Sequence, residues 1–163
     1  EYKYERNFGS GRDVAHIRDG VSLVKLFDFA NECTNPAETK SKMLDWVVYN
    51  LLINNYDAHG KNISFFVGTN GMSLTPFYDL VNIKMYPQFD HELAMALGDE
   101  FDSNTIKAYH LADFADSCQL SRPYFVRQLK NMSSKLSLVL ENERNFDIAI
   151  NDEEKKYLVR YRQ

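Results

Sequence analysis

The highest density of chemically competent side chains lies in a short polar segment, Asn54-Asn55-Tyr56-Asp57-Ala58-His59-Gly60-Lys61-Asn62, of this chain of 163 residues. Further along, Pro76-Phe77-Tyr78-Asp79 adds a second carboxylate. Transfer of a phosphoryl group needs a carboxylate that orients the attacking hydroxyl and accepts its proton. It also needs oxygen ligands for the magnesium ion that bridges the phosphates. Asp57, Asn62 and Asp79 supply these groups, so we expect any phosphotransfer chemistry to depend on them.

The spacing of these three residues matches the order found in protein kinases. There the catalytic Asp precedes a metal-binding Asn by five positions, a pair of strands follows, and a second metal-binding Asp stands just after the strands. Here Asp57 lies five residues before Asn62, a predicted hairpin follows, and Asp79 comes next. Because an antiparallel hairpin returns the chain to its starting edge, Asp79 is expected close to the loop that carries Asp57 and Asn62.

Two predicted helices must position this loop. Apolar residues recur at helical spacing between Gly20 and Cys33, and a second pattern runs from about Glu38 to Leu52. The second pattern is apolar over more than half its circumference, which predicts a buried helix at the centre of a bundle. It ends at Asn54-Asn55, whose side chains compete for backbone hydrogen bonds. The polar loop is therefore expected to extend from a rigid core helix.

A β-hairpin is the clearest strand signal in the chain. Residues 63–67 and 72–75 read as two strands joined by the turn 68–71, and Pro76 ends the second strand. Residues 93–98 fit either a short strand or one helical turn, and both interpretations stay open. The expected fold class is mainly α with a small β-hairpin, in a single domain over residues 1–163.

Three further helices are expected after the hairpin. One covers residues 105–118, one opens at Ser121 with Pro123 just inside its start, and one begins at Asn151 with a capping box to Glu154. The helix after Ser121 carries one apolar stripe that we expect to be core: Phe125, Leu129, Met132, Leu136, Val139 and Leu140.

The same residues resemble the C-terminal lobe of the HipA-like serine/threonine kinases, known mainly as bacterial toxins of toxin–antitoxin pairs. Residues 55–62 match the family's D-x-H-x-K-N catalytic loop, and residues 74–80 match its L-T-P-x-Y-D metal motif. These two motifs are specific because they are correctly ordered and separated by a hairpin. Residues 93–98 and Lys3-Tyr4-Glu5 resemble two looser family segments, and the likeness extends to about Leu140.

The resemblance implies a role for each matching residue. Asp57 would be the catalytic base, and Asn62 and Asp79 would hold Mg²⁺ for the co-substrate ATP. His59 and Lys61 would face the nucleotide phosphates, with Tyr78 beside them. The implied fold is the large, mainly helical C-terminal lobe of a two-lobed kinase. The implied partners are a protein substrate and either an antitoxin or an N-terminal-lobe partner.

Two departures from a complete kinase stand out. A kinase of this kind needs a small β-rich lobe with a phosphate-covering loop, a strand lysine and a hinge that binds adenine. We expect these parts to be absent from this chain, so the chain alone is expected to bind ATP weakly and to lack activity. Gly9-Ser10-Gly11 is interpreted as an ordinary turn, because no strand precedes it and no third glycine follows. Asp79-Leu80-Val81 stands where eukaryotic kinases have D-F-G, which leaves the phenylalanine switch without a counterpart.

Composition narrows the class of protein. With a net charge of −4, the protein lacks the positive electrostatic field that attracts nucleic acid backbones. Its content of 44% hydrophobic residues favours a compact core. Cys33 and Cys118 follow no metal or disulfide pattern and read as small buried hydrophobes of a cytoplasmic protein. No apolar stretch approaches the length of a membrane span, and the remaining histidines, His16, His91 and His110, show no ligand spacing.

Two other functions stay open beside the kinase interpretation. In the first alternative, the chain is a split or degenerate kinase-like lobe that acts as a protein-binding module and catalyses no reaction. In the second, Asp57, His59 and Asp79 would serve a metal-dependent hydrolase. That function would require His59 as a ligand, although no second histidine completes a coordination shell.

Overall fold

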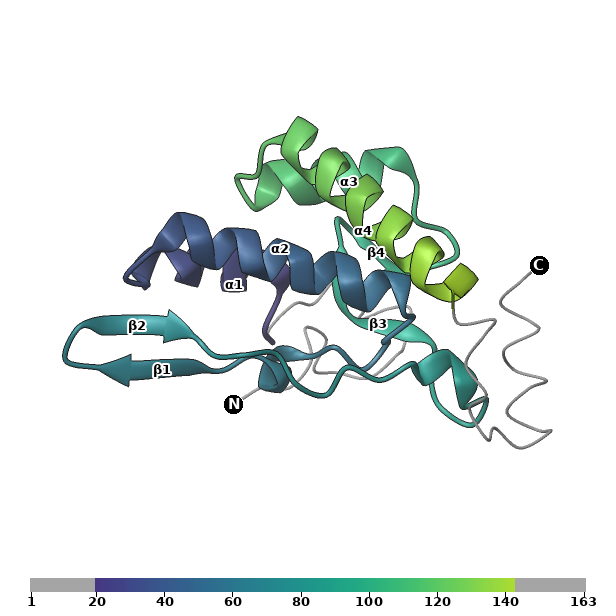
Figure 1. Cartoon of the computed structure of the whole chain (residues 1–163), viewed down its shortest axis with the longest axis horizontal. Coiled ribbons are helices and arrows are strands. Elements are labelled where there is room, and N and C mark those ends of the chain that lie inside the picture. Colours follow the sequence, from purple (N-terminus) through teal and green to yellow (C-terminus); the bar gives the residue numbers. More distant parts are fainter. Residues whose placement is uncertain (1–19, 143–163) are drawn as a thin grey trace.

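The computed structural model describes residues 20–142, and about half of them are helical. Two small antiparallel sheets accompany the helices (Figure 1). The predicted helix from Asn151 and the segments around Lys3 and Gly9 lie outside the described residues. The elements are α1 (Leu23–Phe29), α2 (Pro36–Leu52), β1 (Phe65–Gly68), β2 (Gly71–Leu74), β3 (Glu92–Leu97), β4 (Glu100–Asp102), α3 (Ala108–Ser117) and α4 (Arg122–Asn142).

Helix α2 is the central element, as the sequence predicts. Asn35 caps its start by accepting a hydrogen bond from the backbone N–H of Glu38, and Pro36 occupies the first helical position, where no N–H is needed. Figure 1 shows α2 between the β1–β2 hairpin on one side and α3 and α4 on the other. Met43, Leu44 and Val48 of α2 are almost fully buried between these layers.

Aromatic rings join the other helices to this core. Phe27 of α1 packs edge to face against Phe114 of α3 with ring centroids 5.8 Å apart, and Phe114 packs against Phe125 of α4 at 5.4 Å. All three rings are buried. Burial of side chains of this size is worth about 1.5–3 kcal/mol each, so the ring cluster fixes the helices around α2.

Both short sheets are two-stranded hairpins. In the first, Phe65 pairs with Leu74 and Gly68 with Gly71, which confirms the predicted hairpin with a shift of one or two residues at its ends. In the second, β3 pairs with β4 through an irregular register, so the segment that fitted either structure is a strand. Ala94 of β3 donates its N–H to the carbonyl of Tyr56 at 3.1 Å, which ties this sheet to the polar loop.

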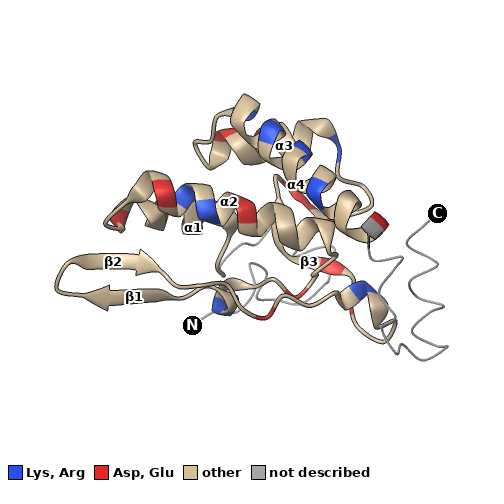
Figure 2. Ribbon diagram, in the orientation of Figure 1, with Lys and Arg blue, Asp and Glu red and all other residues tan. Residues whose placement is uncertain are grey.

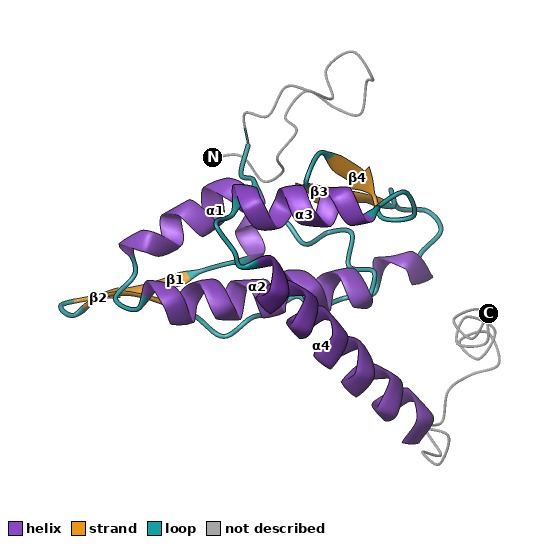
Figure 3. Cartoon of the chain, turned by 90° about the horizontal axis from the view of Figure 1, so that it is seen from above, coloured by secondary structure: helices purple, strands orange, loops and turns teal. Residues whose placement is uncertain are grey.

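The expectation that the whole apolar stripe of α4 is core is wrong for its C-terminal half. Phe125 is buried and Leu129 and Met132 are partly buried, but Val139 and Leu140 are 51% and 53% exposed. The reason is the direction of the helix: α4 crosses α2 near its own start and then runs away from the described body (Figure 3). The predicted helical period is correct, but only the first part of the helix packs against the core.

The surface and the cysteines agree with the composition. Helix α2 carries two lysines, Lys40 and Lys42, between the acidic residues Glu38 and Asp45, and the β1–β2 hairpin carries neither sign (Figure 2). Cys33 and Cys118 are free and buried, and desolvation raises the pKa of the Cys118 thiol to about 12. Among the described residues, no helix is long and apolar enough to cross a membrane.

One glycine is required where β3 turns into β4 against α3. Gly98 has φ +63°, and a Cβ added there would lie 2.7 Å from the backbone oxygen of His110. Gly98→Ala should therefore lower the free energy of unfolding by about 2 kcal/mol or more, because it combines left-handed strain with a backbone clash.

Chemical denaturation measures this loss. Gly68→Ala is the matched control, because an added Cβ meets nothing within 4 Å there, and it should change the unfolding free energy by less than about 1 kcal/mol. Equal stability of the two variants would contradict the assignment.

Candidate active site

The polar loop begins at a well-defined helix end. Asn54, two residues after α2, adopts the left-handed conformation with φ 55°, which Asn tolerates better than most residues. The N–H of Asn54 donates to the carbonyl of Leu51 at 3.3 Å, and the N–H of Asn55 donates to the carbonyl of Asn50 at 2.9 Å. This pair of bonds is a Schellman motif, and it turns the chain sharply away from the helix axis.

A chain of side-chain amides then fixes the loop to the helix. Asn50 donates to the carbonyl of Trp46 at 2.8 Å and accepts from the Asn55 amide nitrogen at 2.7 Å. The same Asn55 nitrogen donates to the backbone carbonyl of Asp79 at 3.0 Å. Asn50 and Asn55 are both more than nine-tenths buried, so these bonds form away from solvent, where they are hard to replace.

The structure brings Asn62 and Asp79 together, as the hairpin argument predicts. The amide nitrogen of Asn62 donates to Oδ2 of Asp79 at 2.8 Å, although 17 residues separate them. Two features of the intervening chain help to position Asp79. The strands β1 and β2, which lie between Asn62 and Asp79 in the sequence, pair with each other. Phe77 then packs against the ring of Trp46 with ring centroids 6.1 Å apart. The returning strand therefore delivers the carboxylate to the loop.

Asp79 itself has a left-handed backbone with φ 58°. This conformation is uncommon for residues other than glycine, and Asp and Asn are among the side chains that adopt it most readily. Such a conformation costs of order 1 kcal/mol or more and persists where neighbouring contacts enforce it. Here the contacts are the Asn55 bond to its carbonyl and the Asn62 bond to its side chain.

Asp57 and His59 lie in the turn between Asn55 and Asn62. Oδ1 of Asp57 is 3.8 Å from Nε2 of His59, which is beyond hydrogen-bond length but within electrostatic reach. The Asp57 side chain is 41% exposed, whereas that of His59 is only 7% exposed. Nδ1 of His59 accepts from the N–H of Lys61 at 3.2 Å and shapes the one-turn helix Gly60–Asn62. The carboxylate thus reaches solvent from a loop that is internally braced.

Lys61 and Tyr78 are both exposed and lie side by side. The Tyr78 hydroxyl donates to the carbonyl of Lys61 at 2.7 Å and lies 2.7 Å from the Ser64 hydroxyl. Tyr78 therefore braces the loop from outside. The nucleotide roles that the resemblance implies for Lys61, Tyr78 and His59 stay predictions.

Asn50 and Asn55 are the residues that reasoning from the sequence missed. The Asn54-Asn55 pair predicts only a helix end, and Asn50 belongs to neither of the two motifs. The available signal was a polar amide on the buried face of α2, because a buried Asn needs partners for its donors and its acceptor.

The oxygen atoms of Asn62 and Asp79 are the kind that Mg²⁺ prefers. The amide nitrogen of Asn62 donates to Asp79, so the carbonyl oxygen of the same side chain is the Asn62 atom that could serve as a second hard donor. In residues 20–142 no cluster of three or more His, Cys, Asp or Glu side chains could hold a metal ion. Asn62 and Asp79 alone would leave most positions around a six-coordinate ion to oxygens from other sources.

Comparison with known proteins decides the family. The model of the HipA-like C-terminal domain matches residues 2–139. The chain belongs to this family. The match ends beside Leu140, where the sequence motifs also cease to resemble the family.

Members of the HipA-like family are similar to this chain in sequence and structure. The chain is 52% identical over 134 residues to the serine/threonine-protein kinase toxin HipA of Shewanella oneidensis, covering 82% of this chain and 31% of that protein. It is 32% identical over 97 residues to the putative kinase Y4mE of Sinorhizobium fredii, covering 60% of this chain and 23% of that protein. The chain thus spans about a third or less of these relatives.

A solved structure shares the fold. A chain in the complex of the Shewanella oneidensis toxin–antitoxin system HipA, HipB and its operator DNA superposes with a TM-score of 0.90 at 45% identity. The match covers 98% of this chain and 37% of that chain. The recognition of the family from the two motifs is thereby confirmed.

The buried amide chain predicts a stability effect. Asn55→Ala removes both bonds from Nδ2 and leaves the Asn50 oxygen and the Asp79 carbonyl without their donor. The free energy of unfolding should fall by about 2 kcal/mol. Asn70→Ala, in the exposed β1–β2 turn, should change it by less than about 0.5 kcal/mol. Denaturant titration of both variants is the measurement, and a neutral Asn55→Ala would contradict the assigned bonds.

Proposed function

We propose that the chain is the phosphotransfer lobe of a serine/threonine kinase of the HipA type, which moves the γ-phosphoryl group of ATP to a protein hydroxyl. The observation that carries the proposal is the hydrogen bond between Asn62 and Asp79, two residues from separate motifs. Their order after Asp57 is that of kinases. Names of relatives that include a kinase toxin and a putative kinase support it further.

Asp57 has the setting that a catalytic base requires. Its carboxylate is partly exposed, so a substrate hydroxyl can approach it, and its loop is fixed by the buried residues on both sides. We assign it to orient that hydroxyl and to accept its proton during transfer. His59 beside it restricts the loop and adds a polar neighbour at 3.8 Å.

Asn62 and Asp79 are the proposed ligands of Mg²⁺. When bound with ATP, the ion would bridge the phosphates and neutralise charge that develops during transfer. The protein's part is to hold the oxygen donors of these two residues in a fixed relation, which the 2.8 Å bond between them does. Lys61 is proposed to contact the phosphates from the exposed side of the loop, next to Tyr78.

The remaining parts of the proposal concern partners. The similar HipA chain was solved with HipB and operator DNA. By that likeness we infer that the protein has an antitoxin partner, and that the lobe works with an N-terminal lobe that completes the nucleotide site. The kinase-like two-lobed architecture is part of this proposal, as are the protein substrate and a cytoplasmic location.

Asp57→Asn tests the catalytic base. It keeps the size and hydrogen-bonding capacity of the side chain but removes its basicity, so transfer from radiolabelled ATP by the full-length protein should fall by about 100- to 10,000-fold. Asp28→Asn, on the exposed face of α1, should leave transfer unchanged. Full activity of Asp57→Asn would rule out the assigned role.

Asp79→Asn tests the metal ligand separately. Asn also adopts the left-handed backbone readily, so the fold should be kept while one negative charge is lost. The concentration of Mn²⁺ that half-saturates the ATP-bound full-length protein should rise roughly tenfold or more, as measured by paramagnetic relaxation of water. An unchanged Mn²⁺ affinity, with Asp28→Asn as the control, would contradict this role.

A further inference from the structure

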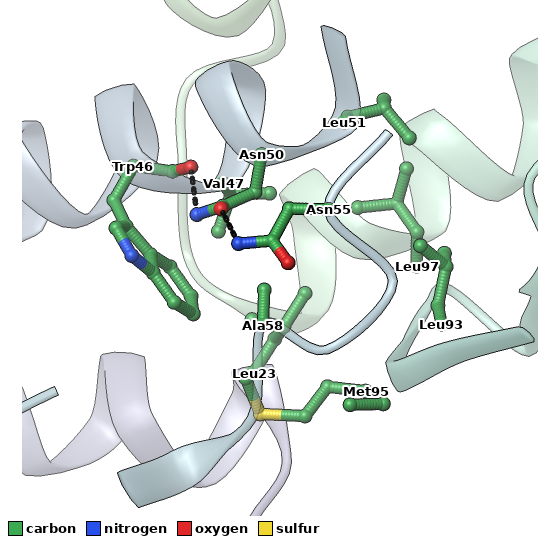
Figure 4. Close-up of a pocket in the computed structure, with 11 residues that line it drawn as sticks. Leu23, Trp46, Val47, Asn50, Leu51, Asn55, Ala58, Leu93, Met95 and Leu97 are labelled. Carbon is green, nitrogen blue, oxygen red and sulfur yellow. Dashed lines mark hydrogen bonds between the residues drawn. The ribbon is translucent and has the colours of Figure 1, made fainter. Parts of the chain in front are cut away.

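A small cavity lies beside the polar loop, where Asn55 and Ala58 are among the residues that line it. It has a volume of about 40 Å³ and is lined by side chains of α1, α2, the polar loop and β3. Leu23, Ala58, Leu93 and Met95 are among them (Figure 4). Nearly all of these groups are apolar, and none of them belongs to the proposed set of catalytic and metal-binding residues.

One polar atom faces this apolar space without a partner. Oδ1 of Asn55 is buried and has no hydrogen-bond partner within the described residues. Both hydrogens of Nδ2 of Asn55 are used by acceptors, the Asn50 oxygen and the Asp79 carbonyl, so the orientation of the amide is fixed. Figure 4 shows Oδ1 turned into the space between Ala58 and the side chains of β3.

The second unpartnered atom nearby does not complete a water site. Nε1 of Trp46 also lacks a partner within the described residues, but Figure 4 shows it on the side of the indole away from Asn55. A buried water needs two to four polar partners, and a site for one water needs about 10–15 Å³. This cavity offers one acceptor and room for about three water-sized groups, which suits an apolar body with a single donor.

We propose that the cavity binds a small uncharged alcohol whose hydroxyl donates to Oδ1 of Asn55 and whose branched aliphatic part fills the space against Leu23, Leu93 and Met95. An unpaired buried carbonyl costs about 1–3 kcal/mol, and this ligand class removes that cost while burying apolar surface. The inference does not depend on the proposed phosphotransfer.

Occupancy of the cavity is coupled to the metal motif through one side chain. The amide that would accept the ligand's hydrogen bond also donates to the carbonyl of Asp79 at 3.0 Å. A bond accepted at the oxygen of an amide polarises its N–H groups and strengthens the bonds that they donate. A bound alcohol therefore tightens the hold of Asn55 on the peptide that joins Asp79 to Leu80.

Propan-2-ol and acetone form a matched pair of probes, because they have nearly the same size and only the alcohol can donate. We would titrate the ¹⁵N-labelled full-length protein with each and follow two NMR signals: the side-chain amide of Asn55 and the backbone N–H of Leu80. Propan-2-ol should shift both signals saturably, and acetone should bind at least about tenfold more weakly. Crystals soaked in propan-2-ol should show the molecule beside Oδ1.

A filled cavity provides the second test. Leu93→Phe adds volume from β3 and should weaken propan-2-ol binding by about tenfold or more, whereas Val139→Phe, on the exposed part of α4, should leave it unchanged. Shifts that rise linearly without saturation, equal binding of acetone, binding that Leu93→Phe leaves intact, or ordered water alone beside Oδ1 would each overturn the proposal. The comparison of the two probes needs no variant, so it decides the question even if Leu93→Phe does not fold.

Discussion

The geometry of the candidate site depends on one amide nitrogen. Nδ2 of Asn55 donates to the side chain of Asn50 on helix α2 and to the backbone of Asp79 after the hairpin. The helix end, the loop and the returning strand therefore share a single buried junction. Because buried donors and acceptors are costly to leave unpaired, the three segments are held in register by that cost more than by the modest net strength of each bond. The Asn62 bond to the Asp79 carboxylate is built on this arrangement.

Most of the scaffold was predictable because the local sequence patterns indicate the same helices and strands that the packed core requires. The apolar period of α2, the Asn-Asn helix end and the strands around the 68–71 turn are signals that short segments carry alone, and the structure has all of them. Residues 93–98 were ambiguous for a physical reason. A run of buried apolar residues satisfies a strand and a helix equally, and the partner strand β4 and the bond from Ala94 to Tyr56 decide between them.

The sequence nominates the chemically active members of the candidate site, but not the residues that support them. Asp57, Asn62 and Asp79 are identified by spacing, and the hairpin argument explains why the last two meet. The supporting roles of Asn50 and Asn55 could not be predicted from a short sequence pattern. Asn50 donates to a carbonyl within helix α2, and Asn55 donates to a backbone carbonyl 24 residues away. The prediction that the end of α4 belongs to the core is wrong for another reason. The period of a helix shows which residues share a face, but not how far the core extends along that face.

The left-handed backbone of Asp79 has an implication for how this position varies. The conformation favours Gly, Asn and Asp, whereas an oxygen ligand requires a side chain with a carbonyl or carboxyl group. Only Asn and Asp meet both conditions. Backbone sterics and ion chemistry thus select the same two residue types independently, and restricted substitution at this position is not, by itself, a signature of catalysis.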